Sequence, residues 1–120
     1  MRYVLLIVVL FITINGACSS EAGGVDKVAV QEAMRIYIDA KIDKGGGTYD
    51  IQGIKAEFDY IHSGVKKKGD LYVSCADFKA GGDVYDIDYY VKSDGEKYVV
   101  VKELFHKKNG KKINVELWKE

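Results

Sequence analysis

The chain has 120 residues, and its 18 basic and 18 acidic side chains give a formal net charge of zero. A nucleic-acid-binding domain would show a basic excess, so this balance argues against that class of partner. The length suits one small domain with one core. Only two cysteines are present, which are too few for the disulfide frameworks of many small secreted domains.

The first 17 residues predict an export signal. Arg2 precedes an apolar run over residues 3–14, and the small residues Gly16 and Ala17 follow. The run is shorter than the roughly 20 residues that a membrane-spanning helix needs. A basic start, a short apolar run and small residues at the end are typical of a cleaved signal peptide.

Cys18 follows these small residues directly, and Gly16-Ala17-Cys18 resembles the lipobox of bacterial lipoproteins. The resemblance implies cleavage before Cys18, acyl chains such as palmitate on this residue, and a tether over residues 18–24. Ser19 is similar to the residue that permits transfer to the outer membrane. We therefore expect a lipid-anchored, periplasm-facing protein of the cell envelope. Because Asn15 stands where an aliphatic residue is usual, the alternative is an ordinary secretory signal with Cys18 as a plain thiol.

Residues 25–43 predict a helix, since apolar side chains recur at steps of three and four residues. Asp26 is the expected N-cap, and the glycines at 45–47 are the expected end. Val30, Met34 and Ile38 widen the apolar stripe. The expected core face consists of Val25, Val28, Ala29, Ala33, Ile36, Tyr37 and Ala40.

From residue 48 onward apolar and polar side chains alternate, which predicts strands with one buried face. The alternating runs cover residues 54–61, 71–76, 85–91, 99–105 and 113–117, and residues 48–51 leave room for a short edge strand. Gly81-Gly82, Asp94-Gly95 and Asn109-Gly110 mark the turns. We expect a three-residue loop over 108–110, because a two-residue loop would turn residues 113, 115 and 117 away from the core.

These elements predict an α+β domain over residues 25–120, with one N-terminal helix packed on a curved antiparallel meander of four to five strands. The order of elements resembles the cystatin-like and nuclear-transport-factor-like folds, and residues 84–113 are similar to small exported PepSY domains. The resemblance implies a sheet that curves around the helix. Gln52-Gly53-Ile54 does not match the Q-x-V-x-G hairpin of cystatin inhibitors, so protease inhibition is not expected.

The expected strand pairing places Cys75 between Phe58 and Ile87 and points Glu103 into the core. Asp77, one inward step from Cys75, would then lie near Tyr85 and Phe105, and with Cys75 and Glu103 it could line a pocket at the open end of the sheet. The resemblance to nuclear-transport-factor-like enzymes implies a cone-shaped pocket lined by such residues. The pocket candidates are Asp77, Glu103, His62 and Cys75. The alternative is that Glu103 only bonds a tyrosine hydroxyl, since a buried carboxylate needs a partner.

Other candidate groups have a plainer interpretation. His62 and His106 are expected on different hairpins, and neither belongs to a metal-binding motif, so we expect no metal site and no cofactor. A mid-strand position suits Cys75 as a small buried hydrophobe better than as a nucleophile. Asp86 and Asp88 share one strand face, which we interpret as a solvated surface rather than a calcium site.

Tyr72, Tyr90 and Tyr98 are expected on the sheet face away from the helix, where tyrosines favour interfaces. The leading hypothesis is a non-catalytic binding or structural module of the envelope. The second is a small-molecule or enzymatic pocket that uses Asp77 and Glu103, and the third is a subunit that self-associates through a sheet edge. The expected partners are the membrane, through a lipid on Cys18, and an envelope protein or a second copy.

Overall fold

A computed structural model describes residues 24–120 of the chain. The predicted export signal over residues 1–17 and the lipid attachment at Cys18 lie outside the described residues. Within residues 24–120, no helix is both long and apolar enough to cross a membrane. The elements in this part of the chain are α2 (Gly24–Lys44), β1 (Tyr49–Ile51), β2 (Ile54–Ile61), β3 (Lys66–Lys68), β4 (Leu71–Ala80), β5 (Asp83–Asp94), β6 (Lys97–Lys108) and β7 (Lys111–Lys119).

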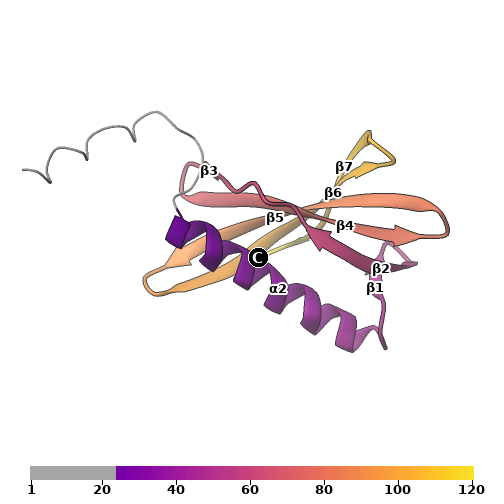
Figure 1. Ribbon diagram of the computed structural model, residues 1–120, viewed down its shortest axis with the longest axis horizontal. Helices are drawn as coiled ribbons and strands as arrows, with labels where there is room; N and C mark the ends of the chain where they lie inside the picture. The colour runs from indigo at the N-terminus through magenta and orange to yellow at the C-terminus, as the bar shows by residue number, and fades with distance from the viewer. Residues whose placement is uncertain (1–23) are drawn as a thin grey trace, which may run out of the picture.

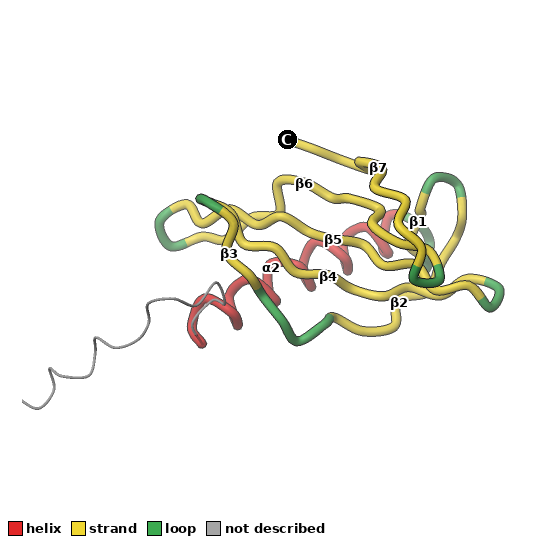
Figure 2. Tube along the Cα trace, turned by 90° about the horizontal axis from the view of Figure 1, so that it is seen from above, coloured by secondary structure: helices red, strands yellow, loops and turns green. Residues whose placement is uncertain are grey.

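The strands form one antiparallel sheet in the order β1-β2-β4-β5-β6-β7, and β3 pairs with β4 beside β2. The helix α2 crosses one face of this sheet (Figures 1 and 2). We call that face the inner face and the opposite one the outer face. The expected α+β meander is confirmed, but the expected four to five strands were too few. The missed strand β3 consists of three lysines, which lack the alternation that marks a half-buried strand.

The core-facing side of α2 consists of Val30, Met34 and Ile38, which are all 0% exposed. Val28 and Ile36 were expected on that side but are 67% and 62% exposed. Two apolar stripes with helical spacing run along α2, and the sheet covers Ala33 and part of Tyr37 from the expected stripe as well. The stripe that packs repeats every four residues, and it includes the longer side chains of Met34 and Ile38.

Aromatic side chains dominate the core between α2 and the sheet. The Tyr49 ring stacks on Phe78 with the ring centroids 4.1 Å apart, and Tyr37 packs edge-on against Tyr89 at 5.8 Å. Buried aromatic rings supply much of the apolar area that stabilises a small core. The largest fully buried side chains are Tyr49, Tyr89, Phe78, Met34, Ile38, Ile51, Ile87, Glu103, Val30, Val65 and Val91.

β4 faces the opposite way from the expectation. Cys75 pairs with Asp88 and not with Ile87, and Phe58 pairs with Phe78 and not with Cys75. The strand extends to Ala80, beyond the alternating run seen in the sequence, and the extra length buries Phe78 on the inner face. The inner residues of β4 are Tyr72, Ser74, Ala76 and Phe78. Cys75 and Asp77 therefore lie on the outer face.

Two of the candidate interface tyrosines, Tyr98 on β6 and Tyr72 on β4, face the core instead of the outer side. The pairing of β5 with β6 shifts between Tyr90 and Val91, and this bulge turns Tyr98 toward α2. The Tyr98 hydroxyl donates to Asp26 at 2.5 Å. Tyr72 is also buried on the inner face, at 7% exposure. Of the three candidate interface tyrosines, Tyr90 alone keeps the expected outer position.

The β6–β7 loop contains two residues and not the expected three. Asn109 and Gly110 have φ values of 52° and 82°, the left-handed pair that a tight hairpin turn requires. A bulge in β7 at Asn114, where φ is 56°, shifts the register by one residue. Val115 consequently returns to a position opposite Phe105. Burial still decides the register, but through a bulge rather than through the loop.

Candidate functional site

The expected inner site around Glu103 is a closed hydrogen-bond network. The side chain is 0% exposed, as its inward orientation predicted. Tyr37 donates to its Oε1 at 2.9 Å, and the Lys41 ammonium lies 3.0 Å from Oε1 and 3.2 Å from Oε2. Tyr49 donates to Oε2 and also bonds the Tyr89 hydroxyl at 2.6 Å. Both carboxylate oxygens therefore have protein partners.

The tyrosines of this network remain protonated donors. Burial raises the pKa of Tyr37, Tyr49 and Tyr89, and the negative charge of Glu103 raises it further. A buried carboxylate with one cation and two phenol donors is well compensated. The expected pocket is not formed, because Asp77, Cys75 and His62 lie on the other face of the sheet from Glu103. The network therefore joins α2 to the sheet and leaves Glu103 without access to solvent.

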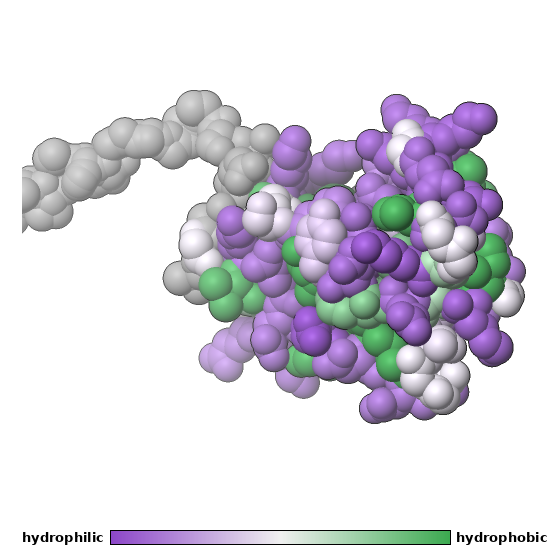
Figure 3. Space-filling view, turned by 45° about the vertical axis from the view of Figure 1, so that its right-hand side comes forward, coloured by the Kyte–Doolittle hydropathy of each residue, from purple (hydrophilic) through white to green (hydrophobic). Residues whose placement is uncertain are grey.

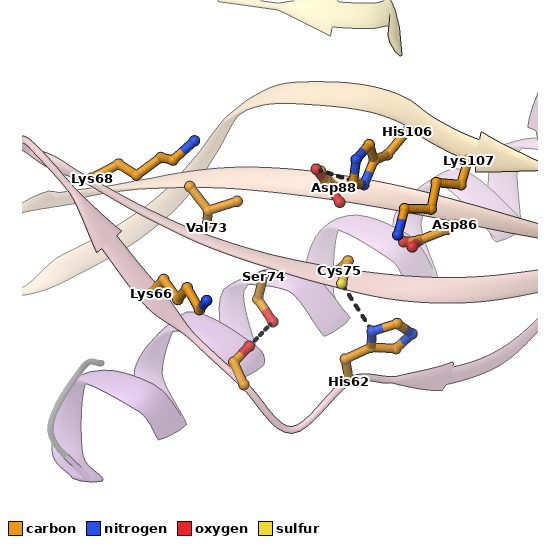
Figure 4. A pocket seen from close by; sticks show the side chains of 11 residues that line it. His62, Lys66, Lys68, Val73, Ser74, Cys75, Asp86, Asp88, His106 and Lys107 are labelled. Carbon is orange, nitrogen blue, oxygen red and sulfur yellow. Dashed lines mark hydrogen bonds and ion pairs between the residues drawn. The ribbon is translucent and has the colours of Figure 1, made fainter. Parts of the chain in front are cut away.

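The outer face carries a different cluster, in a cleft of about 530 Å³. It lies over β4, β5 and β6 and beside the segment that connects β2 to β3 (Figure 4). Its volume falls within the range of about 300–1,000 Å³ that is usual for ligand sites. We call it the outer-face cleft. Its lining residues are His62, Gly64, Lys66, Lys68, Val73, Ser74, Cys75, Asp86, Asp88, His106 and Lys107.

His62 is held at the point where the strand beside β4 is interrupted. Its backbone N–H donates to the Cys75 carbonyl at 2.8 Å, although β2 has ended one residue earlier. Its Nε2 lies 2.8 Å from Asp77 Oδ1, and its Nδ1 lies 2.9 Å from Cys75 Sγ. The Tyr60 ring stacks on the imidazole with centroids 5.2 Å apart. The imidazole of His62 is therefore held at both nitrogens by Asp77 and Cys75 and on one face by the Tyr60 ring.

Asp86 and Asp88 form the centre of the cleft, and His106 reaches it from β6. The β5–β6 register shifts beside Asp86, which leaves His106 as an extra residue on β6. A bulge of this kind can re-aim a side chain, and His106 Nδ1 lies 3.3 Å from Asp88 Oδ2. Asp86 pairs across the strands with Asp77. Among the described residues, the buried Oδ1 of Asp86 has no hydrogen-bond partner.

Crowded charge and partial burial set the protonation of this cleft. Burial raises the pKa of Asp86 and Asp88, and neighbouring carboxylates raise it further. His62 and His106 lower the pKa of Asp86, and His106 lowers that of Asp88. Burial and the nearby Asp86 and Asp88 also raise the pKa of Cys75. An activated cysteine needs a lowered pKa, so the raised pKa disfavours a nucleophilic role for Cys75, although His62 lies within hydrogen-bond reach of its Sγ.

The cleft brings together residues that the sequence appeared to separate. His62 and His106 belong to different hairpins, as expected, yet both line the same cleft. This grouping could not be predicted from a strand pairing that put Cys75 and Asp77 on the inner face. The alternation itself contained the correct signal, since Cys75, Asp77, Asp86 and Asp88 all share one face once β4 is turned over.

Hydrophilic residues dominate the face seen in Figure 3, where hydrophobic side chains form small separate groups. Such a surface does not favour docking through one large apolar patch. Comparison with known protein families, curated proteins and solved structures finds no match for this chain.

Proposed function

We propose that this protein is a non-catalytic binding module of the bacterial cell envelope, with a lipid on Cys18 and the outer-face cleft as its binding surface. The observation that carries the proposal is the contrast between the two faces of the sheet. On the inner face, Glu103 is fully buried, and both of its carboxylate oxygens are bound by protein groups. The outer face has an open, ligand-sized cleft lined by charged groups and one thiol.

This contrast favours the binding module over the enzymatic pocket. The cone-shaped pocket needed Asp77 and Glu103 in one cavity, but these residues lie on opposite faces. The outer-face cleft has a thiol with a raised pKa, which is a poor nucleophile. Cys75, His62 and Asp77 do stand in the order of a nucleophile, a base and a positioning carboxylate. The raised pKa of the thiol, however, favours binding over catalysis there.

The envelope location is supported by the sequence. Arg2, the apolar run over residues 3–14 and the small residues before Cys18 are the features of a lipoprotein signal. Ser19 favours the outer membrane. The proposal therefore places the cleft on a domain that is held close to a membrane and faces the periplasm.

The intact mass of the membrane-extracted protein tests the anchor. We expect a mass gain of acyl size and cleavage before Cys18, and a Cys18→Ala variant should lose the acyl mass. A soluble, unacylated product with a free Cys18 thiol would reject the anchored form of the proposal.

Thiol labelling tests whether the cleft is occupied in the envelope. If Cys18 is acylated, Cys75 is the one free thiol of the chain, and it lines the cleft. We expect a maleimide to label Cys75 more slowly in envelope membranes than in purified protein. A Cys75→Ser, Val99→Cys variant is the control, because Val99 is 45% exposed and lies outside the cleft. Equal labelling of Cys75 in both preparations would contradict the proposed binding surface.

A further inference from the structure

We propose that the outer-face cleft binds one divalent transition-metal ion of the zinc class, with His62, Cys75 and Asp86 as its ligands. The proposal rests on the proposed function, since it names the ligand of the same cleft. Candidate ligand atoms of these three residues all lie within 4.8 Å of one another. They come from the end of β2, from β4 and from β5, so the paired strands fix their spacing (Figure 4).

The orientation of His62 is the one that a metal ligand needs. Asp77 lies 2.8 Å from Nε2, so it can accept the Nε2–H and leave the lone pair of Nδ1 available. That Nδ1 lies 2.9 Å from Cys75 Sγ. Metal-binding histidines commonly donate their second N–H to a carboxylate, which fixes the ring and the tautomer. Asp77 is thus a positioning residue.

The donor atoms favour an ion of the zinc class. Imidazole nitrogen and thiolate sulfur are ligands that Zn²⁺ prefers, whereas Mg²⁺ and Ca²⁺ prefer oxygen. In a tetrahedral site the sulfur and nitrogen ligands stand about 3.5 Å apart. The two atoms lie at 2.9 Å here, so the side chains need to separate by only a fraction of an ångström. The thiol releases its proton to solvent when it binds the ion.

Two carboxylates face each other at this position, in a cleft that Lys66, Lys68 and Lys107 also line. Asp86 lies opposite Asp77 on the neighbouring strand, and like charges placed so are unfavourable. The buried Oδ1 of Asp86 has no partner among the described residues. Lys107, the register partner of Asp86 on β6, also lines the cleft and supplies one competing positive charge. A divalent ion would bind the unpartnered oxygen and offset the repulsion.

A second set of ligand atoms, from Asp86, Asp88 and His106, also lies within 4.8 Å. It contains no sulfur and shares Asp86 with the first set. We assign the ion to the first set because a thiolate adds the stronger preference for zinc. The paired Asp88 and His106 then form the adjacent wall of the cleft.

Cobalt(II) titration of the detergent-extracted full-length protein tests the site. Cobalt stands in for zinc, and a cobalt–thiolate bond gives a charge-transfer absorption in the near ultraviolet. We expect this band at one cobalt per chain, and its loss on addition of zinc. The Cys18→Ala variant should show the same band, which excludes Cys18 as its source. Absence of the band, or its loss in Cys18→Ala, would overturn the proposal.

Single substitutions test the assignment of ligands. Cys75→Ser should abolish the band, and His62→Gln should weaken binding by more than about 100-fold, beyond the 10- to 100-fold usual for second-shell changes. Asp77→Asn should weaken it by about 10- to 100-fold. The matched control His106→Gln should bind as the parent does. Normal binding by His62→Gln, with loss in His106→Gln, would overturn the assignment. Circular dichroism of each variant excludes misfolding as the cause of lost binding.

Chelation separates this inference from the proposed function. If the metal site is occupied in the envelope, a chelator should restore fast maleimide labelling of Cys75 in membranes. Protection of Cys75 that persists with the chelator, together with no cobalt band, would reject the metal site and leave the binding module standing. Equal labelling in membranes and in purified protein would reject the binding surface itself.

Discussion

Single residues show where the stability of this domain is concentrated, and Glu103 is the clearest case. Its carboxylate is 0% exposed and is bound by Lys41, whose side chain is 27% exposed. The removal of one partner of a buried charge usually costs more than the pair itself contributes, because the other charge remains desolvated. The two tyrosine donors, Tyr37 and Tyr49, reduce that cost but cannot neutralise the charge.

Replacement of Lys41 by methionine should therefore destabilise the domain by about 2–3 kcal/mol, less than the loss of a fully buried partner because Lys41 is partly solvated. Urea unfolding followed by circular dichroism measures the change. Lys44→Met is the matched control, because Lys44 is exposed on the same helix. A loss no greater than that of the control would contradict the role given to Lys41.

The buried tyrosines predict a loss of stability at alkaline pH. In the unfolded chain they release their protons near the ordinary pKa of 10.0, whereas Tyr37, Tyr49 and Tyr89 keep theirs to higher pH in the folded state. Their contribution is complete below pH 10.0 and decreases as the pH rises further, since the folded state then binds more protons. Urea unfolding at stepwise alkaline pH should show this decrease. Tyr49→Phe should make it shallower, and Tyr90→Phe should not.

At the scale of elements, the sequence predicted which segments form strands better than it predicted which faces are buried. β5 has the expected inner residues, including Ile87 and Tyr89, because its alternation is unbroken over the whole strand. In β4 both faces carry apolar side chains, so the alternation does not say which face is buried. Phe78 decides this, and it lies beyond the end of the alternating run over residues 71–76. The possible edge strand over residues 48–51 is confirmed as β1, whereas β3 has too few residues for a periodic pattern to mark it.

Bulges account for most of the remaining differences. Each adds one residue to one strand, so every side chain beyond it moves to the other face. Tyr60 and Val99 are exposed for this reason, and Ile61 and Val100 face the core. No residue type marks such a position reliably. The outer-face cleft could not be predicted for the same reason. Its residues come together only because β4 turns Cys75 outward and because a bulge in β6 re-aims His106.

Asn114 offers a test of the bulge in β7. Its φ of 56° is accessible to glycine and asparagine but costs a β-branched residue about 1–2 kcal/mol. Asn114→Val should therefore lower the free energy of unfolding by that amount, while Asn114→Gly should leave it nearly unchanged. Thermal unfolding of both variants measures the difference. Equal stability of the two would show that the bulge lies elsewhere.

At the scale of the whole molecule, the edge strands of the sheet are β1 and β3 on one side and β7 on the other. β1 is only three residues long, and Lys111, Lys112 and Lys119 lie exposed on β7. Short edges and lysines are common protection against pairing with a second chain. This arrangement disfavours the hypothesis of a self-associating subunit.

We therefore expect the protein to remain monomeric in detergent, once detergent mass is subtracted, across the accessible concentration range in sedimentation experiments. A Lys112→Thr, Lys119→Thr variant should associate more readily. The charge-matched control is Lys92→Thr with Lys97→Thr, because β5 and β6 lie in the middle of the sheet and not at its edge. A concentration-dependent dimer of the parent protein, removed by substitution along β7, would restore the self-association hypothesis.

The Glu103 network also bears on the order in which the chain folds. Its donors Tyr37 and Lys41 lie 66 and 62 residues away along the chain, whereas each hairpin from β4 to β7 joins neighbouring segments. Local hairpins close quickly, and contacts over long separations form late. Glu103 therefore remains hydrated until α2 arrives. Loss of its water and docking of the helix become one event, which couples the two halves of the domain kinetically.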